Sequence, residues 1–427
     1  MSSRISTLIS LPSLVAAILL ASPSAAADLH LLGAVSYSWA TACSDDGRVV
    51  AGYDPQSYWY WTLDTGVIQL IGTTISPGSG VGGQASITSD GRFMTVSTLQ
   101  GAEPQKAEAT LYDIENIEYR SIGSWGYNCD IERSGAWNMS PDGQTVVGLA
   151  WEIGCTGKGF SWSNATNVMT SLPSLYFFKP TRANGVSDSG GTVAGWNDDY
   201  NGFRQAAAWV KNASGIYVAT AISAPPPKGS TTPIKMREAQ VVSGNGQWVY
   251  GLGKSTYNGG AMWKWSEATG VLPILPAPVT DIGYPTAVNS DGSRVLGFFG
   301  VLGGNGGYLW SEGTGYVSVN QLAINAGITI PEGWSLTMPL GMSEDGLTIV
   351  GTAWGPISSS PFVLDLRPGK PVCDADLDGD LTVGAADLSM LLAVWGTFGG
   401  SDADLDGDGT VGAADLSLLL ATWGACP

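Results

Sequence analysis

Short apolar segments alternate with polar turns along most of this chain, and one pattern of this kind recurs seven times. Each copy has a polar turn that ends in glycine, then a strand-like apolar segment, with another small residue five positions after the turn glycine. The seven turns read SDDG, TSDG, SPDG, SDSG, SGNG, NSDG and SEDG, and their glycines are Gly47, Gly91, Gly143, Gly190, Gly246, Gly292 and Gly346. Successive turn glycines lie 44 to 56 residues apart, a period that predicts one four-stranded sheet per copy.

The third predicted strand of each copy ends in a large apolar residue. In the first copy the four strands span residues 39–44, 48–53, 57–61 and 67–71. The equivalent large residues are Trp61, Tyr112, Trp162, Trp209, Trp265, Trp310 and Leu364, which we expect to pack between neighbouring sheets. Residues 28–366 are therefore predicted to form a mainly β, seven-bladed β-propeller of four-stranded blades. A six- or eight-bladed ring and two stacked sandwiches remain alternatives, because seven detected copies need not equal seven blades.

The seventh copy lacks a fourth strand, because the chain runs from residues 362–366 into a proline-bearing linker at residues 367–371. A matching sequence, DLHLLG, lies at residues 28–33 and resembles the fourth strand VIQLIG at residues 67–72. An open strand edge invites pairing with another chain. We therefore predict that residues 28–33 pair with residues 362–366 and close the ring.

The C-terminal segment contains an acidic loop twice, as DLDGDLTVGAAD and DLDGDGTVGAAD. Each copy has carboxylates at loop positions 1, 3, 5 and 12 and a threonine whose backbone oxygen stands at position 7. The candidate metal ligands are Asp376, Asp378, Asp380, Thr382 and Asp387, then Asp404, Asp406, Asp408, Thr410 and Asp415. Oxygen ligands at this spacing suit calcium. Gly409 permits the sharp turn at position 6 and Leu381 does not, so we expect the second loop to bind more tightly.

Apolar residues follow each loop at helical spacing: Leu388, Leu391, Leu392 and Trp395, then Leu416, Leu419, Leu420 and Trp423. A helix leaves each loop and none enters it, and each loop ends in Asp. Residues Cys373–Cys426 thus resemble a type I dockerin. The resemblance implies a small helical domain at residues 372–427, two Ca²⁺ ions and a cohesin-type receptor protein as partner. Alanines at 385–386 and 413–414 stand where dockerins often carry hydroxyl residues, which leaves the identity of the receptor open.

The turn, strand and aromatic pattern of residues 28–366 is similar to the HAF-family extracellular repeat, which implies an extracellular propeller. Residues 1–27 have the features of a secretory signal peptide, with Arg4, an apolar segment and a small-residue cleavage site before Asp28. We expect a secreted or extracellular protein with no membrane span; attachment to a cell surface stays open. Five cysteines leave at least one unpaired. We predict the pairs Cys373–Cys426 and Cys129–Cys155, with a buried thiol at Cys43.

The charge of the chain is concentrated in its C-terminal segment. The formal net charge is -18, and residues 372–427 contain ten Asp and no Lys, Arg or Glu. The remaining chain is only mildly acidic and has no basic stripe, which argues against a nucleic-acid partner.

The chain offers few candidates for catalysis, and the catalytic residues are unknown. The recurring turn carboxylates Asp46, Asp90, Asp142, Asp291 and Asp345 are replaced by Ser189 and Asn245 in other copies, so turn geometry accounts for them. The only histidine, His30, lies in the closure strand, which argues against a zinc site or a catalytic triad. GSGVGG at residues 78–83 precedes a strand-like segment and is interpreted as a loop between blades. No glycosidase-like pairing is evident among Glu132, Glu152, Asp198, Asp199 and Glu332.

Tryptophans outside the repeat positions are candidates for stacking on sugar rings: Trp125, Trp137, Trp151, Trp196, Trp334 and Trp354. The leading hypothesis is a non-catalytic propeller that binds a glycan or a protein and is anchored by a calcium-dependent dockerin-cohesin interaction. The second is a polysaccharide-degrading hydrolase or lyase that its dockerin delivers to a complex. A purely structural repeat protein of the cell surface is the third.

Overall fold

The computed structural model describes residues 27–33, 37–71, 83–100, 105–127, 129, 133–253, 262–274, 282–304, 306–367, 375–378, 382–397, 403–406 and 410–425. Residues 27–367 form one compact unit, and the described residues from 375 onwards belong to a second. Several predictions fall outside the described residues: the signal peptide before Ala27, the loop at 78–82, the linker at 368–371, Glu132, Cys373, Cys426, and Asp380, Leu381, Asp408 and Gly409 of the acidic loops.

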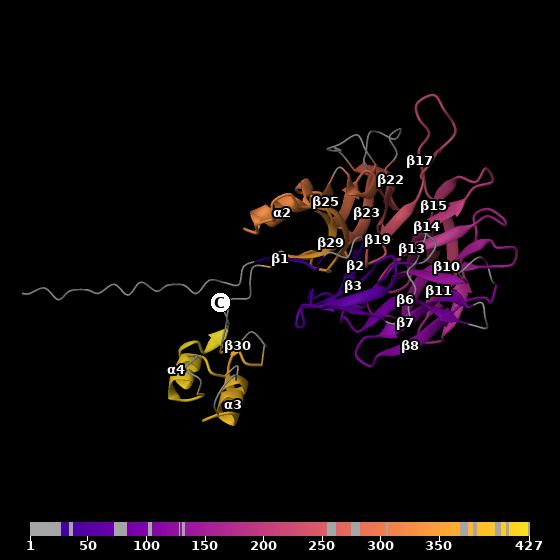
Figure 1. The fold of residues 1–427 in the computed structure, drawn as a ribbon. Coiled ribbons are helices and arrows are strands. Elements are labelled where there is room, and N and C mark those ends of the chain that lie inside the picture. The colour runs from indigo at the N-terminus through magenta and orange to yellow at the C-terminus, as the bar shows by residue number, and fades with distance from the viewer. Residues whose placement is uncertain are drawn as a thin grey trace, which may run out of the picture. The chain divides into compact units, whose positions relative to one another are not determined.

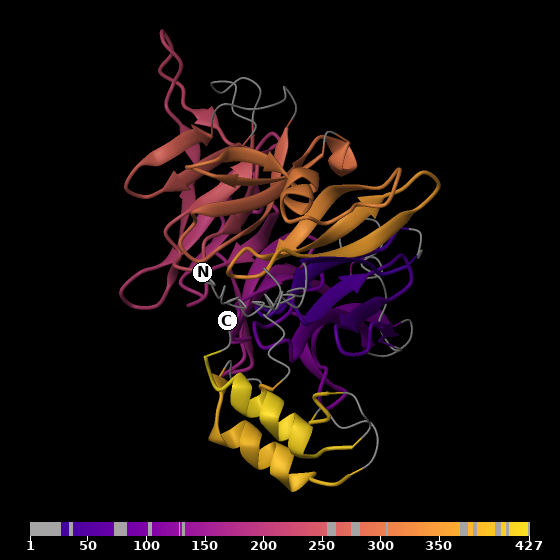
Figure 2. The same cartoon turned by 90° about the vertical axis from the view of Figure 1, so that its left-hand side faces the viewer.

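Seven larger β-sheets in the described part of residues 27–367 are the blades of a propeller (Figures 1 and 2). In six of them the strands follow one another in chain order from the inner to the outer edge, and in the seventh the outer strand is the N-terminal β1. Blade 1 consists of β2 (Trp39–Cys43), β3 (Val49–Tyr53), β4 (Tyr58–Thr62) and β5 (Ile68–Leu70). Blade 3 consists of β9 (Ser134–Met139), β10 (Thr145–Trp151), β11 (Gly157–Ser163) and β12 (Val168–Ser171). Blade 4 consists of β13 (Thr181–Val186), β14 (Thr192–Asp198), β15 (Arg204–Lys211) and β16 (Tyr217–Ala221). Blade 5 consists of β19 (Ala239–Val242), β20 (Val249–Leu252), β21 (Met262–Ser266) and β22 (Gly270–Ile274). Blade 6 consists of β23 (Gly283–Val288), β24 (Arg294–Phe299), β25 (Gly307–Ser311) and β26 (Gly315–Ser318).

Blade 2 departs from the four-stranded pattern. It contains β6 (Phe93–Gln100), β7 (Lys106–Asp113) and β8 (Glu118–Gly123), and its inner segment pairs with β6 through a single bridge between Ile87 and Met94. The two longest repeat periods have extra elements: the hairpin of β17 (Ser223–Ala224) and β18 (Ile234–Lys235) before blade 5, and η1 (Val301–Gly303) with α2 (Val319–Asn325) around blade 6. The prediction of seven blades is confirmed.

Blade 7 is closed by the N-terminal strand, as predicted. It combines β27 (Ser335–Met342), β28 (Thr348–Trp354) and β29 (Ser359–Asp365) with β1 (Asp28–Leu31). β1 runs antiparallel to β29, with Leu29 opposite Leu364 and Leu31 opposite Phe362. Leu29 and Leu31 pack against the buried cluster of blade 7. The chain thus covers the edge that a three-stranded blade would expose.

The turn carboxylates organise turns, as predicted. In blade 1 the Ser44 hydroxyl donates to Asp46 Oδ1 at 2.6 Å, and the same oxygen accepts the N–H of Arg48 at 2.9 Å. Gly47 has a φ of 73°, a backbone conformation that favours glycine. The equivalent large residues of the third strands are all buried, from Leu364 at 0% to Trp265 at 8% exposure. They pack the blades against one another.

The second recurring glycine reflects a close backbone approach. A Cβ at Gly195 would lie 2.0 Å from the carbonyl oxygen of Arg182 on the inner strand, and one at Gly351 would lie 2.3 Å from that of Met338. In the six four-stranded blades the inner strand has a β-bulge at this level. In blade 2 the equivalent position is occupied by Val96, whose side chain would not fit against the carbonyl of an inner strand. This accounts for the pairing of the inner segment with β6 through only one bridge.

The bulged residues of the inner strands connect neighbouring blades. Thr41 Oγ1 donates to Ala85 O at 2.7 Å, Asn184 Nδ2 to Ala239 O at 2.7 Å, and Thr286 Oγ1 to Pro339 O at 3.0 Å. The inner strands enclose a central cavity of about 240 Å³. Buried backbone oxygens need hydrogen-bond donors, and the side chains of the bulged residues in the neighbouring blade provide them.

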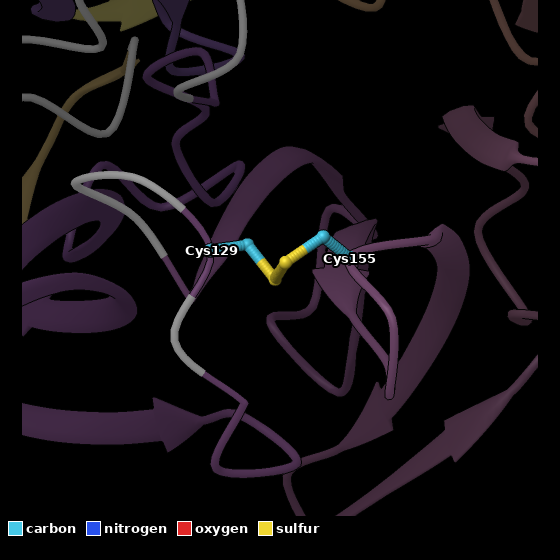
Figure 3. The surroundings of a disulfide bond; sticks show 2 residues. All are labelled: Cys129 and Cys155. Atoms are coloured by element: carbon cyan, nitrogen blue, oxygen red, sulfur yellow. A yellow bond between two sulfur atoms is a disulfide. The ribbon is translucent and has the colours of Figure 1, made fainter.

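The cysteines follow the sequence prediction where the structure describes them. Cys129 and Cys155 form a disulfide that joins the segment before blade 3 to the loop between β10 and β11 (Figure 3). Cys43, on β2, is a buried free thiol. Burial raises the pKa of Cys43 far above its ordinary value, so the thiol stays protonated.

The described part of the second unit consists of two similar halves. Helices α3 (Ala385–Ala393) and α4 (Ala413–Ala421) lie beside each other, and β30 (Thr382–Val383) pairs with β31 (Gly424–Ala425) (Figure 2). In the corresponding place of the other half, the Gly396 N–H donates to Val411 O at 2.8 Å. Equivalent residues form the core: Ala375 and Ala403, Val383 and Val411, Leu391 and Leu419.

Deleting residues 28–33 should destabilise the propeller. We expect the free energy of unfolding to fall by roughly 3–5 kcal/mol, because three partly buried leucines and a row of ladder hydrogen bonds are lost. Differential scanning calorimetry or denaturant titration would measure the change, with Asp28→Ser as the control for an exposed position. An unchanged midpoint for the deletion would contradict the role of this strand in closure.

Adding a Cβ at the close approach should be costly. Gly195→Ala should lower the free energy of unfolding by roughly 1–3 kcal/mol, since the methyl group would overlap the Arg182 carbonyl. Gly313→Ala is the matched control, because a Cβ there would meet no atom within 4 Å. Equal denaturant midpoints for the two variants would refute this explanation.

Candidate functional site

Each acidic loop brings three carboxylates together. Ligand oxygens of Asp376, Asp378 and Asp387 all lie within 4.8 Å of one another, and those of Asp404, Asp406 and Asp415 do the same. Among the described residues these are the two groups of this kind. Residues 372–427 contain no Lys or Arg, so the segment supplies no cationic side chain to balance either trio. Three hard oxygen ligands this close together fit a divalent cation.

The last carboxylate of each loop is held by backbone N–H groups. Asp387 is 1% exposed, and it accepts the N–H groups of Leu377 at 2.7 Å, Asp378 at 3.1 Å and Gly384 at 2.7 Å. Burial alone would raise the pKa of Asp387, but these N–H groups together lower it. In the second loop the N–H of Gly412 is the main cause that lowers the pKa of Asp415. Both groups therefore stay ionised.

The predicted helix behind each loop is present, and its apolar residues are divided between buried and exposed positions. Leu391 is fully buried and Leu388 packs beside it, but Leu392 is 51% and Trp395 45% exposed. Helix α4 repeats this division with equivalent residues, Leu419 being buried and Leu420 and Trp423 half exposed. The reason is that each helix packs on the other half of a very small core, which needs only one row of side chains. The unit thus presents two matching apolar patches.

The six tryptophans proposed for sugar stacking are all buried or partly buried, and at least three of them pack against neighbouring residues. The ring of Trp137 lies 3.8 Å beneath the Arg182 guanidinium of the next blade, and Trp196 is buried between Arg182 and Arg204. Trp334 lies against Gly355. Burial lowers the pKa of Arg182 to about 10, and the charge of Glu238 opposes that shift. This cluster joins blades 3, 4 and 5 rather than presenting a flat exposed ring.

The described carboxylates that were considered for catalysis do not assemble into a site. Asp199 is 4% exposed and accepts the N–H groups of Asn201 and Phe203 and the Lys235 ammonium. Its hydrogen bond with Lys235 is the main cause that lowers its pKa. Burial raises the pKa of Asp198. Glu332 is exposed in the segment before blade 7. These contacts assign Asp199 a structural role.

One end of the central cavity is acidic. Asp45, Asp188 and Glu344 occupy the second position of their turns, and all three line the cavity. The Ser290 N–H donates to Glu344 at 2.7 Å, and its hydroxyl donates to Asp188 at 3.2 Å. Partial burial raises the pKa of Asp45 and of Glu344, and neighbouring carboxylates raise both further. The cavity is thus ill suited to an anionic ligand.

Exposed aromatic side chains gather in the loops of blades 3 and 4, where sequence reasoning did not place a site. Phe177 is 74%, Phe178 73%, Tyr200 67% and Phe203 72% exposed. Phe177, Phe178 and Tyr200 line a groove of about 1180 Å³ between the two blades. The available signal was aromatic residues in the loop-like sequences SLYFFKP and DDYNGF, away from every strand position.

Comparison with known proteins places the propeller among structures of low similarity. No protein-family model and no curated protein matches the chain. TolB from Acinetobacter baumannii is 17% identical over 54% of this chain, with a TM-score of 0.38. The β-propeller domain of the Trilobed protease from Pyrococcus furiosus is 10% identical, covers 77% of this chain and 95% of that domain, and has a TM-score of 0.48.

A third structure, oligogalacturonate lyase from Vibrio parahaemolyticus, is 12% identical, covers 79% of this chain and 93% of that one, and has a TM-score of 0.48. The TolB match spans 52% of the TolB chain, about half its length. The propeller assignment here comes from strand order and register, and these likenesses add nothing about ligands. Across the described residues, none of the helices has the length and apolar character needed to cross a membrane.

Metal binding should follow the two trios independently. Isothermal titration of the full chain with Ca²⁺ should show two molar equivalents, and Asp387→Asn or Asp415→Asn should each remove one, because each substitution takes a carboxylate from one trio. Asp64→Asn, an exposed carboxylate of blade 1, is the control. Two equivalents retained by the double variant would contradict both sites.

Proposed function

We propose that this protein is an extracellular ligand-binding propeller anchored by a calcium-dependent, dockerin-like domain that docks on a cohesin-type receptor. The observation that carries the proposal is the duplicated unit of an aspartate trio followed by a helix with a half-exposed apolar face. A solvated acidic tail would need neither the paired core nor the matching patches.

Calcium is the cation that best suits the two trios. Asp376, Asp378 and Asp387 would hold one ion and Asp404, Asp406 and Asp415 the other; Asp380, Asp408 and the backbone oxygens of Thr382 and Thr410 are further proposed ligands. The bound cation supplies the positive charge that offsets carboxylate repulsion. Asp387 and Asp415 tie each loop to its helix through backbone N–H groups, so loop geometry and helix position are coupled.

The receptor-binding surface is proposed to be the apolar patch of either helix. Leu392 and Trp395 of the first half share one face, they correspond to Leu420 and Trp423 of the second, and all four are between 45% and 52% exposed. Exposed apolar groups of this size are typical of protein contacts. Since the halves are nearly identical, either patch can serve the same receptor.

An extracellular location is supported by two features. The first 27 residues have the pattern of a signal peptide. Cys129 and Cys155 are disulfide-bonded, which is typical of proteins outside the reducing cytosol.

Receptor capture should depend on calcium and on both patches. Biolayer interferometry against a panel of cohesin modules should show binding that EDTA abolishes. Leu392→Ala/Trp395→Ala and Leu420→Ala/Trp423→Ala should each retain capture, and the four-residue variant should weaken it at least about tenfold, because no intact apolar patch remains.

Asp64→Asn serves as the control, since this exposed carboxylate belongs to blade 1 and not to the second unit. Capture that survives EDTA would refute the calcium dependence. Loss of capture in a single-helix variant would refute the equivalence of the two helices.

A further inference from the structure

The aromatic loops of blades 3 and 4 are held in place by buried polar residues. Asn197 is fully buried, and its Oδ1 accepts the N–H groups of Leu175 at 2.6 Å and Tyr176 at 3.3 Å, while its Nδ2 donates to Pro180 O at 2.9 Å. One side chain thus fixes both ends of the segment that carries Phe177 and Phe178. A buried amide satisfied in this way is costly to lose, which makes the loop shape well defined.

A second set of contacts fixes the loop of Tyr200 and Phe203. Asp199 accepts the N–H groups of Asn201 at 2.8 Å and Phe203 at 3.1 Å, and pairs with Lys235 at 2.7 Å. The Lys179 ammonium donates to Tyr200 O at 3.3 Å and so links the two loops. Both loops therefore display their aromatic rings from a rigid base.

The display of these rings has a conformational cost. Phe178 has a φ of 58°, a left-handed conformation that is rare for a bulky residue. Its ring lies 4.0 Å from that of Phe177, and both side chains are about three-quarters exposed. Backbone strain that the surrounding structure maintains is typical of functional sites. Exposed apolar area beside it is typical of binding surfaces.

The groove beside these rings is lined by both apolar and polar residues. Its aromatic and aliphatic residues include Phe177, Phe178, Tyr200, Ile216 and Tyr217. Six serine and threonine residues, with Lys158, Lys211 and Glu152, also line it. Aromatic faces suit the C–H faces of pyranose rings, and hydroxyl, ammonium and carboxylate groups suit their hydroxyls.

We propose that this groove binds a neutral polysaccharide chain, with Phe177, Phe178 and Tyr200 as the stacking surface. A protein partner is disfavoured because interface cores are depleted in Ser, Lys and Glu, which this groove contains. An anionic polysaccharide is disfavoured because the groove offers no strongly basic surface: Lys158 and Lys211 are offset in part by Glu152, and the rest of the propeller is mildly acidic. The volume of about 1180 Å³ exceeds what one sugar ring requires and suits several consecutive units.

The inference rests on the proposed function only in treating the propeller as the ligand-binding part. It requires neither calcium nor a receptor. Its failure and that of the anchoring proposal are therefore distinguishable, since polysaccharide binding should be unchanged by EDTA.

Affinity gel electrophoresis of the full chain would test the proposal, with gels containing mixed-linkage β-glucan, xyloglucan or polygalacturonate. We expect retardation by at least one neutral polysaccharide and none by polygalacturonate. Phe177→Ala/Phe178→Ala should weaken binding at least about tenfold, and Tyr200→Ala should weaken it severalfold, because each removes part of the stacking surface. Ile357→Ala is the matched control: Ile357 is 98% exposed in the loop between the second and third strands of blade 7.

Circular dichroism and thermal midpoints equal to those of the control would establish that the variants are folded. The proposal is overturned if neither neutral polysaccharide retards the protein, or if the aromatic variants bind like the control. Retardation by polygalacturonate that the Phe variants abolish would overturn the neutral class. Self-association in sedimentation experiments that the same variants abolish would show a protein interface instead.

Discussion

In six of the seven blades the inner strand bulges against a glycine of the second strand, at a distance that leaves no room for a Cβ. Bulged residues of the inner strands point toward the next blade. The side chains of three such residues, Thr41, Asn184 and Thr286, donate hydrogen bonds to backbone oxygens of that blade. The ring is thus held together by many equivalent contacts. Closing it with β1 removes the remaining edge, because an unpaired β29 would otherwise present its hydrogen-bonding groups to other chains.

The second unit follows a different principle. Its core is small, and each acidic loop gathers three carboxylates whose ligand oxygens lie within 4.8 Å of one another, with no Lys or Arg between residues 372 and 427. Hydrophobic burial by Leu391 and Leu419 alone offers little to oppose that repulsion. A cation held by each trio would join the start of that loop to its helix, so metal binding and helix position would be coupled.

The strands and the loops of the propeller use their aromatic residues differently. The strand tryptophans are used for packing, and Trp137 and Trp196 enclose Arg182 rather than facing solvent. In contrast, the loops of blades 3 and 4 expose aromatic rings on a base fixed by Asn197 and Asp199. Rigid elements that carry specialised loops are a common way to build a binding surface, because the loops vary without loss of the core.

The repeat number, the closure strand, the Cys129–Cys155 pair and the grouping of the acidic side chains near the C-terminus could be read from the sequence, because turn residues, strand length and loop spacing are local properties. Tertiary structure decided the rest. Blade 2 has Val96 where the other blades have a glycine, and its inner segment pairs with β6 through a single bridge. The sequence alone does not reveal this difference in pairing, because the glycine is needed only where the inner strand approaches the second strand closely. Leu391 and Leu392 are adjacent and equally apolar, and only the packing of the opposite half buries the first and exposes the second. The groove of Phe177, Phe178 and Tyr200 joins two loops whose proximity depends on the placement of neighbouring blades.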